Sequence, residues 1–117
     1  ELRATITTAK EMGYKRLIVV HQPFTYSRTK MLFNDFVDVL KIPDITVLTP
    51  IMGSREPNDP TITSAKLAAQ IPGAVLVDGL KEAADWVKQN AQPGDLVLTL
   101  GCGDIYKAGK MMVADAQ

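Results

Sequence analysis

The chain has 117 residues, about the size of one domain with a buried core. Lysine plus arginine equals aspartate plus glutamate at 13 each, which predicts no binding to nucleic acid or to a membrane surface. The single cysteine excludes an internal disulfide framework, and no apolar run approaches the roughly 20 residues that cross a bilayer, so a cytoplasmic protein is expected.

Apolar spacing and turn residues predict helices that alternate with strands. Apolar residues recur every three or four positions in the helices, and short runs rich in Val, Ile and Leu mark the strands. The chain begins at Glu1 directly in a helical pattern, which we interpret as a fragment of a longer protein. The predicted order is helix 2–12, strand 16–20, helix 30–40, strand 45–48, helix 64–71, strand 74–77, helix 80–87, strand 95–100 and a last helix capped by Asp104.

This alternation predicts an α/β fold, namely a single doubly wound, Rossmann-like and mostly parallel sheet with helices on both faces. No internal repeat or linker interrupts the pattern, so residues 1–117 are expected to form one domain. The carboxyl ends of parallel strands meet at one edge of the sheet, where ligands bind. Three polar loops leave that edge, at residues 21–29, 50–60 and 101–104.

The first of these loops, HQPFTYSRT, places Arg28 among hydroxyl side chains at the start of a helix. Free backbone N–H groups and a guanidinium there suit a carboxylate or a phosphate, and hydrogen bonds to a charged partner are worth roughly 1.5–3 kcal/mol. Arg28 is therefore the first candidate, with a solvated arginine as the alternative. Ser27 and Thr25 are as typical of a helix N-cap as of a ligand contact. His21, the only histidine, is expected to be a structural hydrogen-bonding residue.

The third loop places Gly101 and Gly103 on either side of Cys102, and such glycines allow a ligand to approach the backbone closely. The third glycine of the dinucleotide fingerprint is missing because Tyr106 stands there, and no GxxxxGK[ST] loop occurs. The chain alone therefore lacks the standard means of holding ATP or NAD. Asp104 is interpreted as a helix cap first and a ligand contact second. Without a second histidine or a cysteine pair, no metal site is expected.

The longest loop contains Gly53, Arg55 and Glu56. One interpretation of Arg55 and Glu56 is a surface ion pair that adds little stability. The other is a ligand contact, because this loop leaves the same edge of the sheet. The residues alone leave both interpretations open.

Three segments, HQPFTYSRTKMLFNDF, IMGSRE and QPGDLVLTLGCGDI, together resemble the C-terminal domain of the Mur ligases over essentially the whole chain. The resemblance implies a three-domain enzyme of peptidoglycan synthesis that joins L-alanine to UDP-N-acetylmuramate through an acyl phosphate. It also implies that ATP and Mg²⁺ are held mainly by a central domain outside this chain, so no cofactor is expected in the fragment and no turnover from it alone. The alternative is a free-standing α/β module that binds a small anion.

The resemblance also implies site residues. Arg28 matches the arginine that holds the amino-acid carboxylate, with Tyr26 beside it, and Gly101 lines the same cleft together with the loop that carries Gly53, Arg55 and Glu56. Further contacts to nucleotide or neighbouring groups are expected from Ser27, Gly103 and Asp104. No catalytic residue and no metal ligand is assigned.

The chain departs from the family pattern at three positions. Phe24 and Thr25 stand where the family commonly has histidine then arginine, and His21 stands where it has phenylalanine. Substrate contacts at these positions are therefore not carried over from the family.

Overall fold

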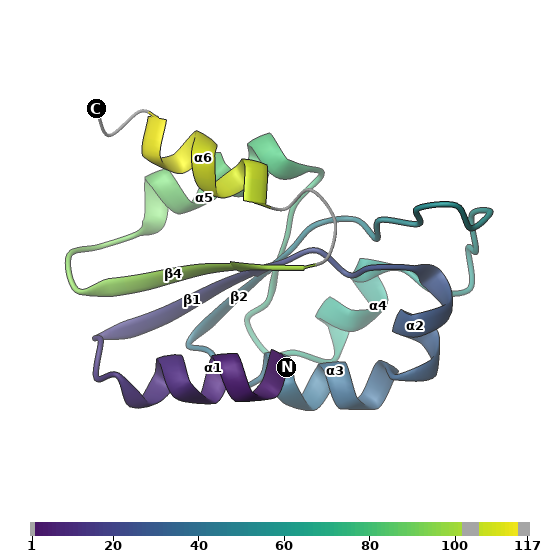
Figure 1. Ribbon diagram of the computed structural model, residues 1–117, viewed down its shortest axis with the longest axis horizontal. Coiled ribbons are helices and arrows are strands. Elements are labelled where there is room, and N and C mark those ends of the chain that lie inside the picture. Colours follow the sequence, from purple (N-terminus) through teal and green to yellow (C-terminus); the bar gives the residue numbers. More distant parts are fainter. Residues whose placement is uncertain (1, 102–105, 115–117) are drawn as a thin grey trace.

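The computed structural model describes residues 2–101 and 106–114, in which helices pack on both faces of a parallel sheet (Figure 1). In chain order the elements are α1 (Leu2–Glu11), β1 (Arg16–His21), α2 (Tyr26–Met31), α3 (Phe33–Leu40), β2 (Ile45–Leu48), α4 (Ser64–Ala69), β3 (Val75–Leu76), α5 (Leu80–Asn90), β4 (Asp95–Leu100) and α6 (Tyr106–Ala114).

The strand order is β3-β2-β1-β4, and every pairing is parallel. The chain proceeds outward from β1 through β2 to β3 and then returns to the other side of β1 for β4. The direction of winding therefore changes between β1 and β4. In open α/β sheets, ligands bind beyond the carboxyl ends of the strands at such a switch point. The predicted doubly wound fold is confirmed.

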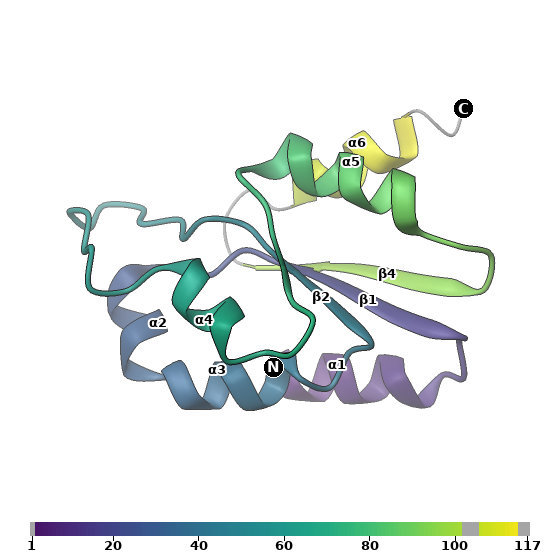
Figure 2. The ribbon, with the colours of Figure 1, turned by 180° about the vertical axis from the view of Figure 1, so that it is seen from behind.

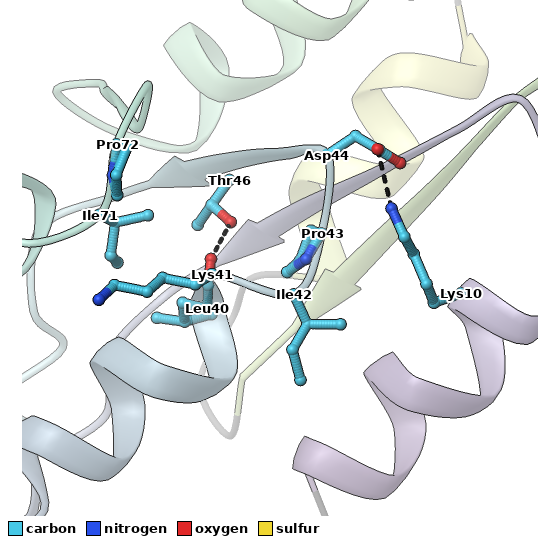
Figure 3. Close-up of a pocket in the computed structure, with 9 residues that line it drawn as sticks. All are labelled: Lys10, Leu40, Lys41, Ile42, Pro43, Asp44, Thr46, Ile71 and Pro72. Carbon is cyan, nitrogen blue, oxygen red and sulfur yellow. Dashed lines mark hydrogen bonds and ion pairs between the residues drawn. The ribbon is translucent and has the colours of Figure 1, made fainter.

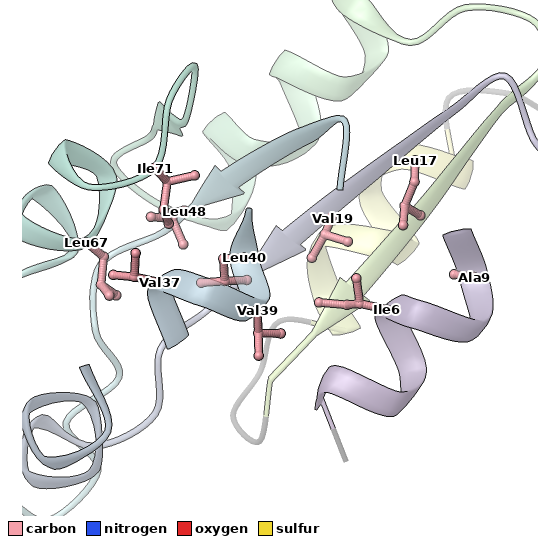
Figure 4. Packing of buried hydrophobic residues seen from close by; sticks show 10 residues of the cluster. All are labelled: Ile6, Ala9, Leu17, Val19, Val37, Val39, Leu40, Leu48, Leu67 and Ile71. Atoms are coloured by element: carbon pink, nitrogen blue, oxygen red, sulfur yellow. The ribbon is translucent and has the colours of Figure 1, made fainter. Parts of the chain in front are cut away.

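Alternating side chains of β1 supply two separate cores, one on each face of the sheet. Leu17 and Val19 pack with residues of α1, α3 and α4, and Figure 4 shows this cluster. Ile18 and Val20 point the other way and pack with residues of α5 and α6. All four side chains are nearly or completely buried, as the apolar run predicts for a central strand covered on both sides. The view from behind shows the same two helical layers (Figure 2).

The predicted helix 30–40 is wrong in two respects. Helix formation begins earlier, at Tyr26, and the segment is divided at Leu32 into α2 and α3. The hydrogen bonds from Leu32 N–H to Arg28 O (3.0 Å) and from Phe36 N–H to Leu32 O (2.9 Å) bridge the division. Because the chain stays nearly helical at Leu32, the apolar periodicity continues from α2 into α3. The sequence pattern therefore does not indicate that the helix is divided.

Other boundaries differ by one to three residues. β1 extends one residue further to His21, and α5 continues over polar residues to Asn90. β3 is shorter than the predicted 74–77, because it is an edge strand that pairs only with two residues of β2. α1 and α4 end slightly before their predicted ends at 12 and 71. The predicted cap of the last helix, Asp104, lies outside the described residues.

Ion pairs hold the amino ends of the strands. Arg16 donates two hydrogen bonds to Asp95, from Nε to Oδ1 (3.0 Å) and from an Nη atom to Oδ2 (2.7 Å), and so ties β1 to β4. Asp44 accepts from Lys10 Nζ (2.8 Å) and from the backbone N–H of Leu17 (2.7 Å). These bonds lower the pKa of the Asp44 carboxyl, with the Lys10 contact as the largest cause. The charged groups at this edge therefore serve the fold.

A pocket of about 460 Å³ also lies at this amino edge (Figure 3). Its walls come from the end of α1 and from the segments that precede β2 and β3. Its polar groups include the Lys10–Asp44 pair and Thr46, whose hydroxyl donates to Leu40 O (2.7 Å). This pocket lies at the opposite edge from the predicted ligand site.

Candidate functional site

A larger pocket, of about 720 Å³, lies at the switch point between the carboxyl ends of β1 and β4. Its volume falls in the range of roughly 300–1,000 Å³ that is typical of small-molecule sites. We call it the switch pocket. Its polar and backbone lining comes from Thr5, His21, Gln22, Arg28 and Gly101. Its apolar lining comes from Leu2, Phe24, Met31, Leu32, Phe36 and Leu100.

Arg28 is the only charged side chain among the described residues that line the switch pocket. It lies on α2 and is exposed, and no described acidic group lies within ion-pair distance of its guanidinium. An unpaired cation at the mouth of a mostly apolar pocket favours an anionic ligand. Gly101 lines the same pocket, so the structure brings together these two predicted residues.

His21 forms part of the wall of the switch pocket and is 5% exposed. Its Nδ1 lies 3.0 Å from Leu100 O, which also accepts the backbone N–H of Gln22 at 3.2 Å. The ring of Phe36 lies against the imidazole, with centroids 6.0 Å apart. Burial lowers the pKa of His21 to about 4, so the ring is neutral at neutral pH. The prediction of a structural hydrogen-bonding histidine is confirmed.

Thr25 caps α2 in an unusual backbone conformation. Its φ of 61° and ψ of 145° lie in a region that a β-branched residue rarely adopts and that costs about 1–3 kcal/mol. Four hydrogen bonds hold it there: its N–H donates to Met52 O (2.9 Å), its carbonyl accepts from Thr29 Oγ1 (2.8 Å) and from the Thr29 N–H (3.2 Å), and its hydroxyl accepts from Arg28 N–H (3.3 Å). This constraint determines where α2 begins and therefore where Arg28 lies.

The carboxylate of Glu56 occupies the start of α2. It accepts hydrogen bonds from the backbone N–H groups of Tyr26 (2.7 Å) and Ser27 (3.1 Å), and a short one from the Ser27 hydroxyl. The Ser27 side chain, followed by the backbone bonds, lowers the pKa of Glu56. The sequence predicted free N–H groups here for a ligand, and this prediction is wrong because the chain supplies its own carboxylate.

Gly53 brings the same loop close to α2. A Cβ atom at this position would lie 2.3 Å from Cε2 of Tyr26, so only glycine allows the aromatic ring to pack there. We call Tyr26, Ser27, Gly53 and Glu56 the α2 clasp. The clasp lies beside the switch pocket and does not line it.

The remaining predicted residues have different positions. Arg55 is exposed. The described part of the chain shows no ion pair between Arg55 and Glu56, so the interpretation of these two residues as a surface ion pair is wrong. Cys102, Gly103 and Asp104 lie outside the described residues.

Sequence reasoning missed the apolar walls of the switch pocket. Met31 is 76% exposed and lines the pocket, as does Leu2 of α1. Leu2 falls on the apolar stripe of the first predicted helix, and Met31 is interpreted from the sequence as a core or helix-face residue. An apolar stripe indicates a buried face, and its spacing does not distinguish a pocket wall from a core position such as that expected of Leu2. The core interpretation of Met31 is wrong, because its side chain is mostly exposed.

The described residues lack two features that would indicate other functions. No group of three or more His, Cys, Asp or Glu side chains gathers where it could hold a metal ion. No helix within the described ranges has both the length and the apolar character to cross a bilayer.

Comparison with known proteins gives a consistent set of relatives. A family model described as "Mur ligase, glutamate ligase domain" matches residues 1–103. A UDP-N-acetylmuramate–L-alanine ligase of Acetivibrio thermocellus is 37% identical over 100% of this chain and 26% of its own length. The enzyme of the same name from Lachnospira eligens is 41% identical over 94% of this chain and 25% of its own length. The chain therefore spans about a quarter of these curated relatives.

One solved structure shows the same fold. It is a domain described as part of a UDP-N-acetylmuramate:L-alanyl-gamma-D-glutamyl-medo-diaminopimelate ligase from Haemophilus ducreyi. Its TM-score to this chain is 0.72 at 18% identity, and the match covers 99% of this chain and 81% of that one.

Proposed function

The chain belongs to the Mur ligase family, and from this premise we propose that residues 1–117 form the C-terminal domain of a three-domain, ATP-dependent ligase. The proposed enzyme joins L-alanine to UDP-N-acetylmuramate through an acyl phosphate, in the cytoplasm, as a step of peptidoglycan synthesis. The names of the relatives at 37% and 41% identity support this substrate pair. The family match favours this function over a free-standing anion-binding module.

One observation carries the proposal for this domain. Arg28 is the sole charge among the described lining residues of the switch pocket, and its guanidinium has no acidic partner among the described residues. A guanidinium can bind a carboxylate through two parallel hydrogen bonds. We assign Arg28 to the carboxylate of L-alanine, with Gly101 allowing close approach of the backbone. Held in this way, the substrate keeps its amino group free to attack the acyl phosphate.

The α2 clasp is proposed to act through Arg28. Glu56 and Gly53 fix the start of α2, and Arg28 lies in the first turn of that helix. Arg55, exposed on the same loop, is proposed to face substrate when the other domains close over this one. Such a domain contributes by orienting the reactants and excluding water.

The described residues do not by themselves form a site for ATP or Mg²⁺. The sequence has no GxxxxGK[ST] loop, and the described residues contain no cluster of metal-ligating side chains. We therefore derive no step through either group, and the nucleotide contacts expected of Ser27, Gly103 and Asp104 stay predictions. In the proposed enzyme, the central domain would hold both.

The test uses the full-length product of the gene that encodes this chain, assayed for phosphate release with ATP, UDP-N-acetylmuramate and L-alanine. Arg28→Ala is expected to raise the KM for L-alanine roughly 10- to 100-fold, as the loss of charge-assisted hydrogen bonds predicts. Lys41→Ala serves as the control, because Lys41 is an exposed cation at the opposite edge of the sheet. An unchanged KM for L-alanine in Arg28→Ala, or turnover by the isolated chain, would contradict the proposal.

A further inference from the structure

Unusual backbone conformations are concentrated in the two loops beside the start of α2. Apart from glycine, the described residues with a positive φ are Thr25 (61°) and Ser54 (59°). The loops that carry them hydrogen-bond to each other, since Thr25 N–H donates to Met52 O (2.9 Å) and Met52 N–H donates to Pro23 O (2.8 Å). Strained residues persist only where the surrounding structure holds them, and they are frequent at functional sites. Thr25 is therefore a candidate for a functional role.

Thr25 has a strained backbone because it serves two elements at once. Its neighbour Phe24 forms a parallel bridge with Met52, so hydrogen bonding between the segments that follow β1 and β2 extends as far as Thr25 N–H. The next residue, Tyr26, already begins α2. No connecting residue stands between the paired segment and the helix. The whole change of direction therefore falls on the dihedral angles of Thr25.

These dihedral angles also separate two groups that line the switch pocket. Phe24, which precedes Thr25, contributes to the apolar wall, and Arg28, in the first turn of α2, contributes the cation. A rotation about the backbone of Thr25 would turn α2 relative to the paired segment, and Arg28 would then move relative to Phe24. The arrangement of cation and apolar wall therefore depends on a conformation that threonine adopts only under constraint.

The hydroxyl of Thr29 supplies part of this constraint. Thr29 is completely buried, and its Oγ1 donates to the carbonyl of Thr25 at 2.8 Å. Threonine in helices often donates to the carbonyl four residues earlier, and here that carbonyl belongs to the strained residue. The backbone N–H of Thr29 reaches the same oxygen at a longer distance of 3.2 Å. Removing the hydroxyl therefore weakens the hold on Thr25 without replacing any lining residue of the switch pocket.

We propose that Thr25 and Thr29 are positioning residues for the amino-acid substrate. The Thr29 hydroxyl keeps Thr25 in its strained conformation, and that conformation holds Arg28 and Phe24 in the arrangement that binds the substrate. This inference rests on the proposed function and extends it to two residues outside the lining of the pocket. When only a fraction of the molecules has the binding arrangement, the apparent affinity falls by that fraction. Loss of the constraint therefore raises KM and leaves the reaction of bound substrate unchanged.

Steady-state kinetics of the full-length gene product tests the role of the Thr29 hydroxyl. Thr29→Val keeps the shape of the side chain and should raise the KM for L-alanine roughly tenfold, as expected if about a tenth of the molecules keep the binding arrangement, with kcat nearly unchanged. Thr46→Val is the matched control, because Thr46 is also buried and its hydroxyl also donates to a backbone carbonyl, Leu40 O at 2.7 Å, at the opposite edge of the sheet. Equal KM values for the two variants would overturn the proposal.

Glycine at position 25 distinguishes a role of the strain from a general loss of stability. Glycine adopts a positive φ without strain, so Thr25→Gly added to Thr29→Val should restore most of the lost affinity for L-alanine. A double variant as impaired as Thr29→Val would refute the role of Thr25. If Thr29→Val does not fold, thermal denaturation of Thr25→Gly and Thr25→Ala decides. Strain predicts the higher melting temperature for the glycine variant, the reverse of the usual order, and a higher value for the alanine variant would overturn the proposal.

The outcomes also separate this inference from the proposed function. If the wild type does not use L-alanine, both fall. If Arg28→Ala raises the KM for L-alanine but Thr29→Val does so no more than Thr46→Val, only the positioning role is refuted.

Discussion

His21 should make the stability of this chain depend on pH in a range where few other groups titrate. Its pKa is about 4 in the folded chain, against an ordinary value of 6.5. As pH falls below 6.5, the unfolded chain binds a proton that the folded chain refuses, so the free energy of unfolding decreases until the folded pKa is reached. At about 1.4 kcal/mol for each pH unit, the full loss is roughly 3 kcal/mol, and about 2 kcal/mol of it occurs by pH 5.

Urea denaturation of the chain at pH 7.5, 6 and 5 measures this effect, with His21→Phe as the matched variant. Four carboxyl groups have pKa values below their ordinary values, which are 3.8 for an aspartate and 4.5 for a glutamate: Asp44, Glu56, Asp59 and Asp95. The stability that these carboxylates contribute is therefore lost only below about pH 4.5. The wild type should lose about 2 kcal/mol between pH 7.5 and 5, and His21→Phe should lose much less. A flat profile in the wild type, or equal slopes in both proteins, would show that the folded ring is accessible to protons.

Two predictions concern the α2 clasp. Gly53→Ala should lower the free energy of unfolding, measured by urea denaturation, by about 1–3 kcal/mol, because the added methyl group overlaps the ring of Tyr26. Gly109→Ala is the control. Its added Cβ would lie 3.6 Å from the nearest side-chain atom, so this variant should be as stable as the wild type or more stable. Glu56→Gln should lower the melting temperature and weaken amide protection at Ser27, because a neutral amide replaces the carboxylate that caps α2. The exposed Glu11, replaced by Gln, is its control, and equal melting temperatures for the two variants would contradict a capping role.

The fold could be predicted because its determinants are local. The apolar run of β1 requires cover on both faces, and Gly13 and the Pro93–Gly94 pair separate helices from strands within a few residues. Parallel strands must then gather their carboxyl ends at one edge, which placed Arg28 and Gly101 near each other before any coordinates were known.

The rest depends on contacts between distant parts of the chain. Glu56 reaches the start of α2 from 29 and 30 positions away, and nothing in the spacing indicates that its carboxylate fills that position. Whether an apolar residue such as Met31 faces a core or a pocket depends on which helix lies opposite it. The unusual φ of Thr25 likewise follows from pairing with the neighbouring loop at Met52, and propensity alone argues against it.

The hydrogen bond between His21 and Leu100 joins two residues that lie 79 positions apart and both line the switch pocket. No local segment of the chain can therefore assemble this pocket early, and recognition of a ligand must wait until β4 has docked beside β1. Closing so long a loop costs conformational entropy, so we expect binding competence to arise late in folding. A ligand that binds only the folded pocket consequently stabilises the whole native state. The gain in the free energy of unfolding grows with the logarithm of the ratio of ligand concentration to dissociation constant.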